Sequence, residues 1–310
     1  MSTAAATTPN EGLHLSEDVA WRLLQALAAA ASRGVPAPDD AGLALDEHDE
    51  LMLVPEGRGL ITLRSDSPHG FETTVASETA RALLDLYLPL CVGERAASLV
   101  VAHLGQSLDG RVATVTGASR FITGPEDLRH THRLRALFDA VVIGARTARL
   151  DDPQLTTRLV PGPNPTRVVL DPRAGLGPGL RLLRDGCAPT VLVRAPRHAS
   201  RNAYTGHVDE LAVEPQDGVL APSAVLDGLR RRGLRRIFIE GGGITVSHFL
   251  HAGALDRLQL SVAPKIIGSG APALSLPPIE HLTDALDLRC RRFVLGADVL
   301  FDCDLRYGLA

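Results

Sequence analysis

Residues 236–250, RIFIEGGGITVSHFL, join a short apolar run to an amphipathic run through three consecutive glycines. The β-branched and aromatic residues 237–239 predict a strand that ends at Glu240, and the stretch after the glycines has helical spacing. Backbone N–H groups and the dipole at a helix start attract phosphate, and glycines lack the Cβ atoms that would keep a ligand away. The segment therefore predicts a phosphate cradle. A plain glycine-rich turn is the alternative, because the segment matches neither G-x-G-x-x-G nor a P-loop.

Strand-like and helical segments alternate from residue 97 onward, which is typical of an α/β fold with a mainly parallel sheet. The predicted strands are residues 98–104, 140–143, 166–170, 190–193, 236–239 and 258–262, and the predicted helices are residues 125–137, 223–232 and 244–252. Residues 291–306 instead predict an antiparallel C-terminal hairpin, because two apolar runs flank a turn at residues 296–298. This combination resembles the three-layer dihydrofolate-reductase-like fold more than a dinucleotide-binding fold.

Residues 1–96 depart from this rhythm and predict a small α+β N-terminal extension. Residues 1–12 are rich in small side chains, and we expect them to form a disordered tail. Ser16 suits the N-cap of a helix that runs to about Ser32. The elements expected beyond it are strand-like runs at residues 50–54 and 60–64, joined by a turn, and a helix over about residues 77–87 that ends near Pro89.

Composition and charge exclude several classes of protein. The net charge of −4 and the aromatic content of 4% give no reason to expect nucleic acid binding. No apolar run approaches the roughly 20 residues of a membrane span, and the N-terminus lacks the features of a signal peptide. Four widely separated cysteines without a C-x-x-C pair predict buried thiols in a reducing compartment, and neither a disulfide framework nor a zinc site. They are Cys91, Cys187, Cys290 and Cys303. We therefore expect a soluble, cytoplasmic protein.

Five ordered segments resemble the reductase domain of the bacterial bifunctional deaminase/reductase enzymes of riboflavin biosynthesis. They are LGQSLDGRVA (104–113), residues 119–158, RVVLD (167–171), IFIEGGG (237–243) and LQLSVAPKIIG (258–268). The resemblance covers residues 97–310 and implies an NADPH-dependent reductase domain with the dihydrofolate-reductase-like fold. The implied reaction converts the ribosylamino group of a phosphorylated pyrimidine, 5-amino-6-(5-phosphoribosylamino)uracil, to a ribitylamino group. A homodimer is also implied.

Two alternatives to this activity stay open. The same pocket could reduce another nitrogen heterocycle or glycosylamine in a specialised pathway. The chain could also be a catalytically idle relative that binds nucleotide and partners another enzyme through its N-terminal region.

The resemblance implies a substrate site at Ser119, Arg135, Leu155, Arg158 and Glu240. Guanidinium groups suit a phosphate because their planar fork pairs with two of its oxygens. Glu240 is expected to orient the substrate, since a carboxylate accepts hydrogen bonds from the N–H edge of a heterocycle. Arg135 lies in an arginine-rich helix, where a solvated face is the alternative. Glu240 could instead cap the following helix, and both roles can coexist.

The cofactor site is implied in the same way. Its residues are Gly105, Phe121, Thr147 and Asp151, together with Gly242, Gly243, Ile244, Thr245, Val246, Ser247 and His248. Turn formation is the alternative for Asp151, which precedes Asp152 and Pro153. Asp109 is expected to shape the chain beside the cofactor and receives no catalytic task. Arg194 and Arg197 are candidates for the 2′-phosphate of NADPH, with a solvated loop as the alternative.

Three departures from the family pattern matter. His103 stands where many members have Lys, and it replaces a permanent cation by a group that titrates near neutral pH. It is a possible catalytic residue, with a core histidine as the alternative. Phe121 replaces a usual Trp and loses the indole N–H donor. His48 and Glu50 form an H-x-E sequence, but no P-C-x-x-C follows, so we expect neither a metal nor deaminase activity.

Overall fold

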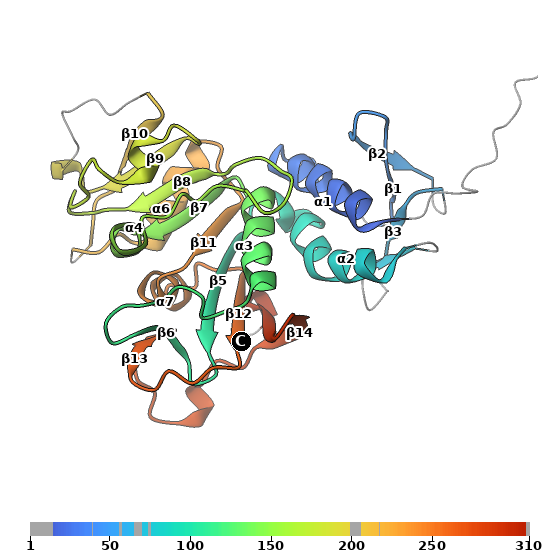
Figure 1. Cartoon of the computed structure of the whole chain (residues 1–310). Helices are drawn as coiled ribbons and strands as arrows, with labels where there is room; N and C mark the ends of the chain where they lie inside the picture. Colours follow the sequence, from blue (N-terminus) through green and yellow to red (C-terminus); the bar gives the residue numbers. More distant parts are fainter. Residues whose placement is uncertain are drawn as a thin grey trace, which may run out of the picture. The chain divides into compact units, whose positions relative to one another are not determined.

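The computed structural model describes residues 15–38, 40–55, 58–64, 70–73, 76–198, 206–216 and 218–307. The chain divides into two compact units, residues 1–98 and 99–310 (Figure 1). This division falls two residues beyond the boundary predicted at residue 96. The tail predicted for residues 1–12 lies outside the described residues.

Unit 1 combines two helices with a small antiparallel sheet. Its elements are α1 (Glu17–Ser32), β1 (Gly42–Leu45), β2 (Leu51–Val54), β3 (Ile61–Leu63), β4 (Phe71–Glu72), α2 (Glu78–Cys91) and the short 3-10 helix η1 (Glu94–Ala97). Ser16 caps α1 as predicted, since its Oγ accepts a hydrogen bond from the N–H of Val19 at 3.3 Å. Trp21 and Tyr87 pack edge to face, with ring centroids 6.0 Å apart, and join the two helices.

One prediction for unit 1 needs correction, and one strand was missed. The two predicted strands form as β2 and β3, and the missed strand β1 lies between them in the order β2-β1-β3-β4. The sequence hides β1 because it is only four residues long and opens with Gly42. The second helix continues through Pro89 to Cys91, since one proline near a helix end removes a single backbone donor without stopping the last turn.

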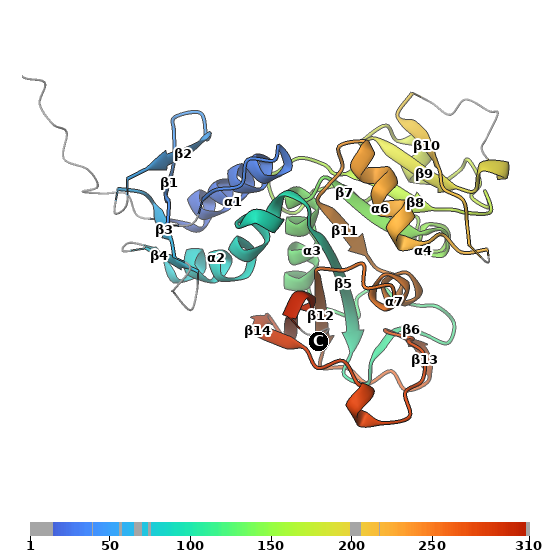
Figure 2. The ribbon, with the colours of Figure 1, turned by 180° about the vertical axis from the view of Figure 1, so that it is seen from behind.

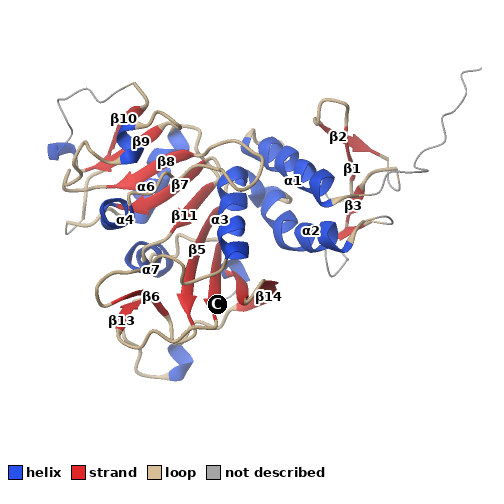
Figure 3. Ribbon diagram, viewed as in Figure 1, coloured by secondary structure: helices blue, strands red, loops and turns tan. Residues whose placement is uncertain are grey.

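Unit 2 is built on a nine-stranded sheet in the order β10-β9-β8-β7-β11-β5-β12-β15-β14 (Figure 3). The strands from β10 to β12 are parallel, and β15 and β14 add antiparallel to β12. Its elements are β5 (Val100–Ser107), β6 (Arg111–Thr114), α3 (Pro125–Leu137), β7 (Ala140–Gly144), α4 (Ala145–Asp151), β8 (Thr166–Leu170), α5 (Arg181–Arg184), β9 (Thr190–Arg194), β10 (Val208–Ala212), α6 (Pro222–Arg231), β11 (Ile237–Glu240), α7 (Gly243–His251), β12 (Arg257–Ala263), β13 (Gly270–Pro272), β14 (Arg289–Leu295) and β15 (Asp298–Asp304). The predicted mainly parallel sheet with a C-terminal hairpin is confirmed.

Helices cover both faces of this sheet, and the two faces differ in chemistry. The helices α6 and α7 pack on one face, which Figure 2 shows from their side, and α3 lies on the other. The face under α6 and α7 is apolar, and β5 contributes Val100, Ala102 and Leu104 to its core cluster. Because side chains alternate along a strand, His103 of β5 points to the opposite face. The sheet therefore has one apolar and one partly polar face.

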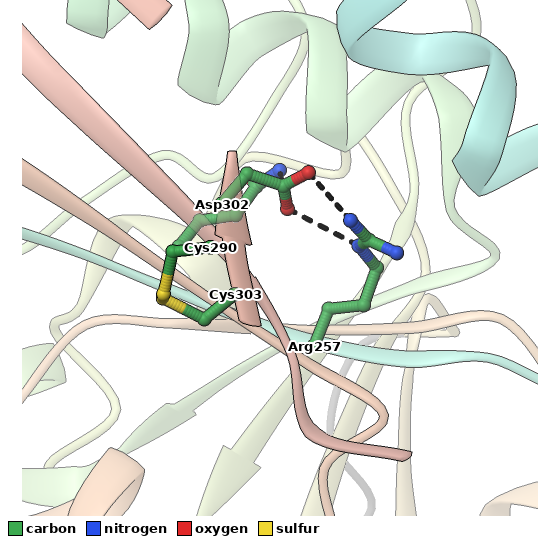
Figure 4. Close-up of a disulfide and its surroundings, with 5 residues drawn as sticks. Arg257, Cys290, Asp302 and Cys303 are labelled. Atoms are coloured by element: carbon green, nitrogen blue, oxygen red, sulfur yellow. Dashed lines mark hydrogen bonds and ion pairs between the residues drawn. A yellow bond between two sulfur atoms is a disulfide. The ribbon is translucent and has the colours of Figure 1, made fainter. Parts of the chain in front are cut away.

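The cysteine prediction is wrong for three of the four residues. Cys290 and Cys303 form a disulfide that joins the edge strand β14 to β15 (Figure 4). The hairpin register places them directly opposite each other, with Cα atoms 4.1 Å apart, a closeness that a separation of 13 residues does not reveal. Cys187 is an exposed thiol outside any disulfide, and Cys91 is a buried one.

We expect this disulfide to stabilise unit 2. Closing a loop of this size removes chain entropy from the unfolded state and contributes about 3 kcal/mol. A Cys290→Ser variant, or the wild type in dithiothreitol, should therefore unfold at a lower urea concentration than the oxidised wild type. The matched control is Cys187→Ser, which should keep the wild-type midpoint. Equal midpoints for oxidised and reduced protein would contradict the expectation.

Candidate active site

The polar face of the sheet lies against α3 at the centre of unit 2. His103 on β5 is in register with Glu240 on β11 and with Gln259 on β12. Ser261 on β12 and Asp302 on β15 add to this face, and both are buried. Polar groups are expensive to bury unless they have partners or a ligand, so this concentration inside a sheet indicates a site.

An ion pair between Arg135 of α3 and Glu240 of β11 joins the helix to the sheet. The Nε of Arg135 donates to Oε2 of Glu240 at 2.7 Å, and a second guanidinium nitrogen bonds Oε1. The third nitrogen donates to the carbonyl oxygen of Thr156 at 2.9 Å. Arg135 is only 6% exposed, which rejects the alternative of a solvated helix face. The two predicted substrate-binding residues are thus also each other's partners.

Arg158 lies beside this pair and remains exposed. Its backbone N–H donates to Nδ1 of His132 at 2.8 Å, and its guanidinium donates to Oγ1 of Thr156 at 2.6 Å. Partial burial and the neighbouring Arg135 lower the pKa of Arg158, which shows that cations crowd at this point. Burial and the same two guanidiniums lower the pKa of His132 to about 4, so its neutral ring can accept the N–H of Arg158. Crowded positive charge favours an anionic ligand.

The remaining predicted substrate residues lie on the adjoining loops. Leu155 is 1% exposed and has a φ of 55°, a region that residues other than glycine seldom adopt. Its side chain belongs to the core, so only its backbone can meet a ligand. The hydroxyl of Ser119 donates to Oδ1 of Asp151 at 3.4 Å, which ties a predicted substrate residue to a predicted cofactor residue.

The predicted strand, glycine turn and helix form as expected at β11 and α7. Gly242 has a φ of 75° and precedes the first turn of α7. A Cβ atom added to Gly242 would lie 2.8 Å from Oγ1 of Thr147, and one added to Gly243 would lie 2.4 Å from the carbonyl oxygen of Ala273. A Cβ on Gly144 would lie 2.7 Å from Oγ1 of Thr245. Close backbone approach therefore brings the starts of α4 and α7 together.

Side chains of the predicted cradle residues divide between the core and the surface. Val246 is fully buried, and Ser247 is 4% exposed. The hydroxyl of Ser247 donates to the Gly243 carbonyl at 2.6 Å and accepts from the backbone N–H of Ser275 at 2.8 Å. Ile244 and His248 are exposed. Val246 and Ser247 can therefore offer a ligand only their main chain.

A second group of predicted cofactor residues follows β5. A Cβ on Gly105 would lie 2.8 Å from Cγ2 of Thr123, so the chain approaches closely there as well. Phe121 is 81% exposed, and its carbonyl accepts a hydrogen bond from Nζ of Lys265. An exposed aromatic ring on a backbone with a φ of 65° offers an apolar surface to a ligand.

Asp109 and Arg194 have structural partners. The Asp109 carboxylate accepts hydrogen bonds from the Ser107 hydroxyl and from the N–H groups of Ile267 and Gly268, which lower the pKa of Asp109 to about 2. This geometry agrees with a role in shaping the chain. Arg194 is 2% exposed and pairs with Asp171 and Glu210, so its candidacy for the 2′-phosphate is wrong. Arg197 is exposed and keeps that candidacy.

The sequence analysis missed Asp127, which pairs with His103. Oδ1 of Asp127 lies 3.2 Å from Nε2 of His103, and both side chains are buried. An acid in the first turn of a helix is ordinary capping chemistry, so nothing in the sequence marked Asp127 as part of a site. His130 of α3 also faces this region, and its ring nitrogen lies 2.9 Å from Oε1 of Gln259.

Two absences among the described residues bear on other classes of function. No group of three or more His, Cys, Asp or Glu residues among them is arranged to hold a metal ion. Within the same ranges, no helix is both long enough and apolar enough to cross a membrane.

Comparison with known proteins gives relatives that cover about two thirds of the chain or more. The family model of the RibD C-terminal domain matches residues 98–299. The 2,5-diamino-6-ribosylamino-4(3H)-pyrimidinone 5′-phosphate reductase of Methanothermobacter thermautotrophicus is 36% identical over 215 residues, which span 66% of this chain and 96% of that protein. The riboflavin biosynthesis protein RibD of Aquifex aeolicus is 30% identical over 251 residues, which span 79% of this chain and 67% of that protein.

Solved structures support the fold. The deaminase/reductase of Thermotoga maritima gives a TM-score of 0.61 at 18% identity, covering 93% of this chain and 99% of that one. A riboflavin biosynthesis reductase of Saccharomyces cerevisiae gives a TM-score of 0.55 at 20% identity, covering 67% of this chain and 89% of that one.

The Arg135–Glu240 pair generates a stability prediction. Replacing Arg135 with Met should lower the free energy of unfolding by about 3 kcal/mol, because it leaves a largely buried carboxylate without its partner. Urea unfolding measures the change. Arg129→Met, an exposed arginine of the same helix, is the control and should change stability by less than about 0.5 kcal/mol. Similar losses in both variants would show that the pair contributes nothing specific.

Proposed function

Because the chain belongs to the RibD C-terminal domain family, we propose that it reduces the ribosylamino group of a phosphorylated ribosylaminopyrimidine to a ribitylamino group with NADPH. The observation that carries the proposal is the juxtaposition of the Arg135–Glu240 pair with the exposed cation of Arg158. An acceptor for a heterocycle's N–H groups and a positive region for a phosphate lie side by side, as such a substrate requires. The relatives named as reductases of 2,5-diamino-6-ribosylamino-4(3H)-pyrimidinone 5′-phosphate support it.

On the substrate side, we assign the phosphate contact to Arg158. Arg135 holds Glu240 in place and adds its charge to the same region. Glu240 accepts hydrogen bonds from the pyrimidine, and Ser119 and the Leu155 backbone complete the contact. The substrate is then oriented by its two ends, which leaves the sugar carbon between them for reaction.

On the cofactor side, the glycine cradle suits a diphosphate. Added Cβ atoms at Gly242 and Gly243 would collide with neighbouring atoms, so these positions require a bare backbone at the start of α7. Main-chain groups of residues 242–248 would hold the diphosphate, and Gly105, Phe121, Thr147 and Asp151 would contact the rest of the nucleotide. Bound NADPH supplies a hydride, and the chain supplies placement, charge and exclusion of water. In its open form the ribosylamino group is an imine. Its reduction to the amine consumes one proton together with the hydride.

We also propose that the protein is a cytoplasmic homodimer without nucleic acid or membrane partners. The N-terminal unit carries no assigned role in the reaction.

Oxidation of NADPH tests the activity directly. We expect turnover with 5-amino-6-(5-phosphoribosylamino)uracil, with 2,5-diamino-6-ribosylamino-4(3H)-pyrimidinone 5′-phosphate, or with both. The fall in nicotinamide absorbance and mass spectrometry of the ribitylamino product provide two readouts. Tight NADPH binding without turnover of either compound would reject the activity and favour an idle relative.

The Arg158→Ala variant tests the phosphate contact. Loss of a charge-assisted hydrogen bond of about 1.5–3 kcal/mol should raise the KM for the phosphorylated substrate by about 10- to 100-fold. The variant should show little change with the dephosphorylated nucleoside, because that compound lacks the group that Arg158 contacts. Arg129→Ala is the matched control and should behave as the wild type with both compounds. Equal effects on both compounds would refute the assignment.

A further inference from the structure

His103 and Asp127 form a buried pair of opposite charge at the centre of the polar face. Nε2 of His103 lies 3.2 Å from Oδ1 of Asp127, and each side chain is about one-twentieth exposed or less. Burial lowers the pKa of a histidine, but Asp127, Glu240 and the Gln259 backbone together outweigh burial and raise the pKa of His103 above its usual value. Burial raises the pKa of a carboxyl group, but His103, His130 and Ser261 together hold the pKa of Asp127 well below its usual range.

This pair lies between the two halves of the proposed site. On the substrate side, His103 is in register with Glu240 of the neighbouring strand, and the two attract each other through their charges. On the cofactor side, a Cβ atom added to Gly105 would lie 3.4 Å from Oδ2 of Asp127. The Nδ1 of His103 makes no hydrogen bond of ordinary geometry with a described residue, although the Gln259 backbone also favours the charged ring.

We propose that His103, paired with Asp127, is a positioning residue that holds the Glu240 carboxylate together with Arg135. The proposal rests on the proposed function, because Glu240 is there the acceptor for the substrate's heterocycle. Glu240 is then fixed between two cations, one on α3 and one on β5.

The charges around His103 decide how the site responds to pH. Asp127 faces it from α3 and Glu240 from β11, and both are acids. His130, also on α3, is the remaining titratable neighbour, and burial followed by the charge of His103 lowers its pKa to about 3. From β12 the neighbour is the uncharged Gln259. His103 therefore loses its charge at a higher pH than an ordinary histidine does, and Glu240 then loses one of its two cations.

The experiment measures KM and kcat for the phosphorylated substrate from pH 7 upward, where a phosphate with a second pKa of about 6 no longer titrates. In the wild type we expect KM to rise about tenfold as His103 deprotonates, the loss of one modest charge-assisted interaction, with little change in kcat. His103→Lys should move this rise to higher pH. Asp127→Asn should move it to lower pH, and His103→Gln should have the raised KM throughout. The control His281→Gln, an exposed histidine, should follow the wild-type profile.

A second readout does not depend on turnover. The pKa of His103, measured by NMR titration of its ring, should lie above the usual value of a histidine in the wild type and fall in Asp127→Asn. A purely structural role would lower thermal stability in these variants and leave the pH of the KM rise where it is. The proposal is overturned if the pKa of the His103 ring is not raised above the usual value of a histidine, or if His103→Lys keeps the wild-type pH profile. If the phosphorylated substrate is not turned over but the pKa of His103 is raised, the result counts against the proposed function alone.

Discussion

The ion pair between Arg135 and Glu240 joins the parts from which the candidate site is built. Arg135 belongs to α3, Glu240 ends β11, and the remaining guanidinium nitrogen binds the Thr156 carbonyl of the adjoining loop. Three segments far apart in the sequence are thus held by one side chain. A buried guanidinium needs all its donors satisfied, so each segment limits where the other two can lie. The positions of Leu155 and Arg158 follow from this constraint, because Leu155 precedes Thr156 and Arg158 lies two residues after it.

The sheet separates stability from chemistry by using its two faces differently. Under α6 and α7, apolar residues such as Ala102 and Ile239 form a continuous core. Under α3, polar residues of the central strands pair with polar residues of that helix. Arg257 of β12 and Asp302 of β15 likewise form a two-point ion pair (Figure 4). The apolar face can maintain the fold while the polar face carries charges that a site needs.

Much of this architecture is predictable from local pattern. The strand at Thr166–Leu170 and the helix at Pro125–Leu137 form with the predicted bounds, because a β-branched run and a proline-initiated helix are strong local signals. The missed β10 starts at Val208, and its strand carries Asp209 and Glu210 among its five residues, so its apolar pattern is weak. The pairing of His103 with Asp127, and of Cys290 with Cys303, depends on tertiary contacts and strand register. Side chains that meet through the fold leave no periodicity in the sequence, and Arg194 was misjudged for the same reason.

The central strand β5 pairs with β11 and β12, which lie more than a hundred residues further along the chain. On the ribosome, β5 is therefore made long before its neighbours exist. Its two hydrogen-bonding edges therefore remain without β11 and β12 until translation has passed residue 263. Closing such distant pairings is slow, because the chain entropy of the intervening segment is lost before the contacts form. The region of the central strands that carries Glu240 and Gly105 is consequently among the last parts of the nascent protein to form.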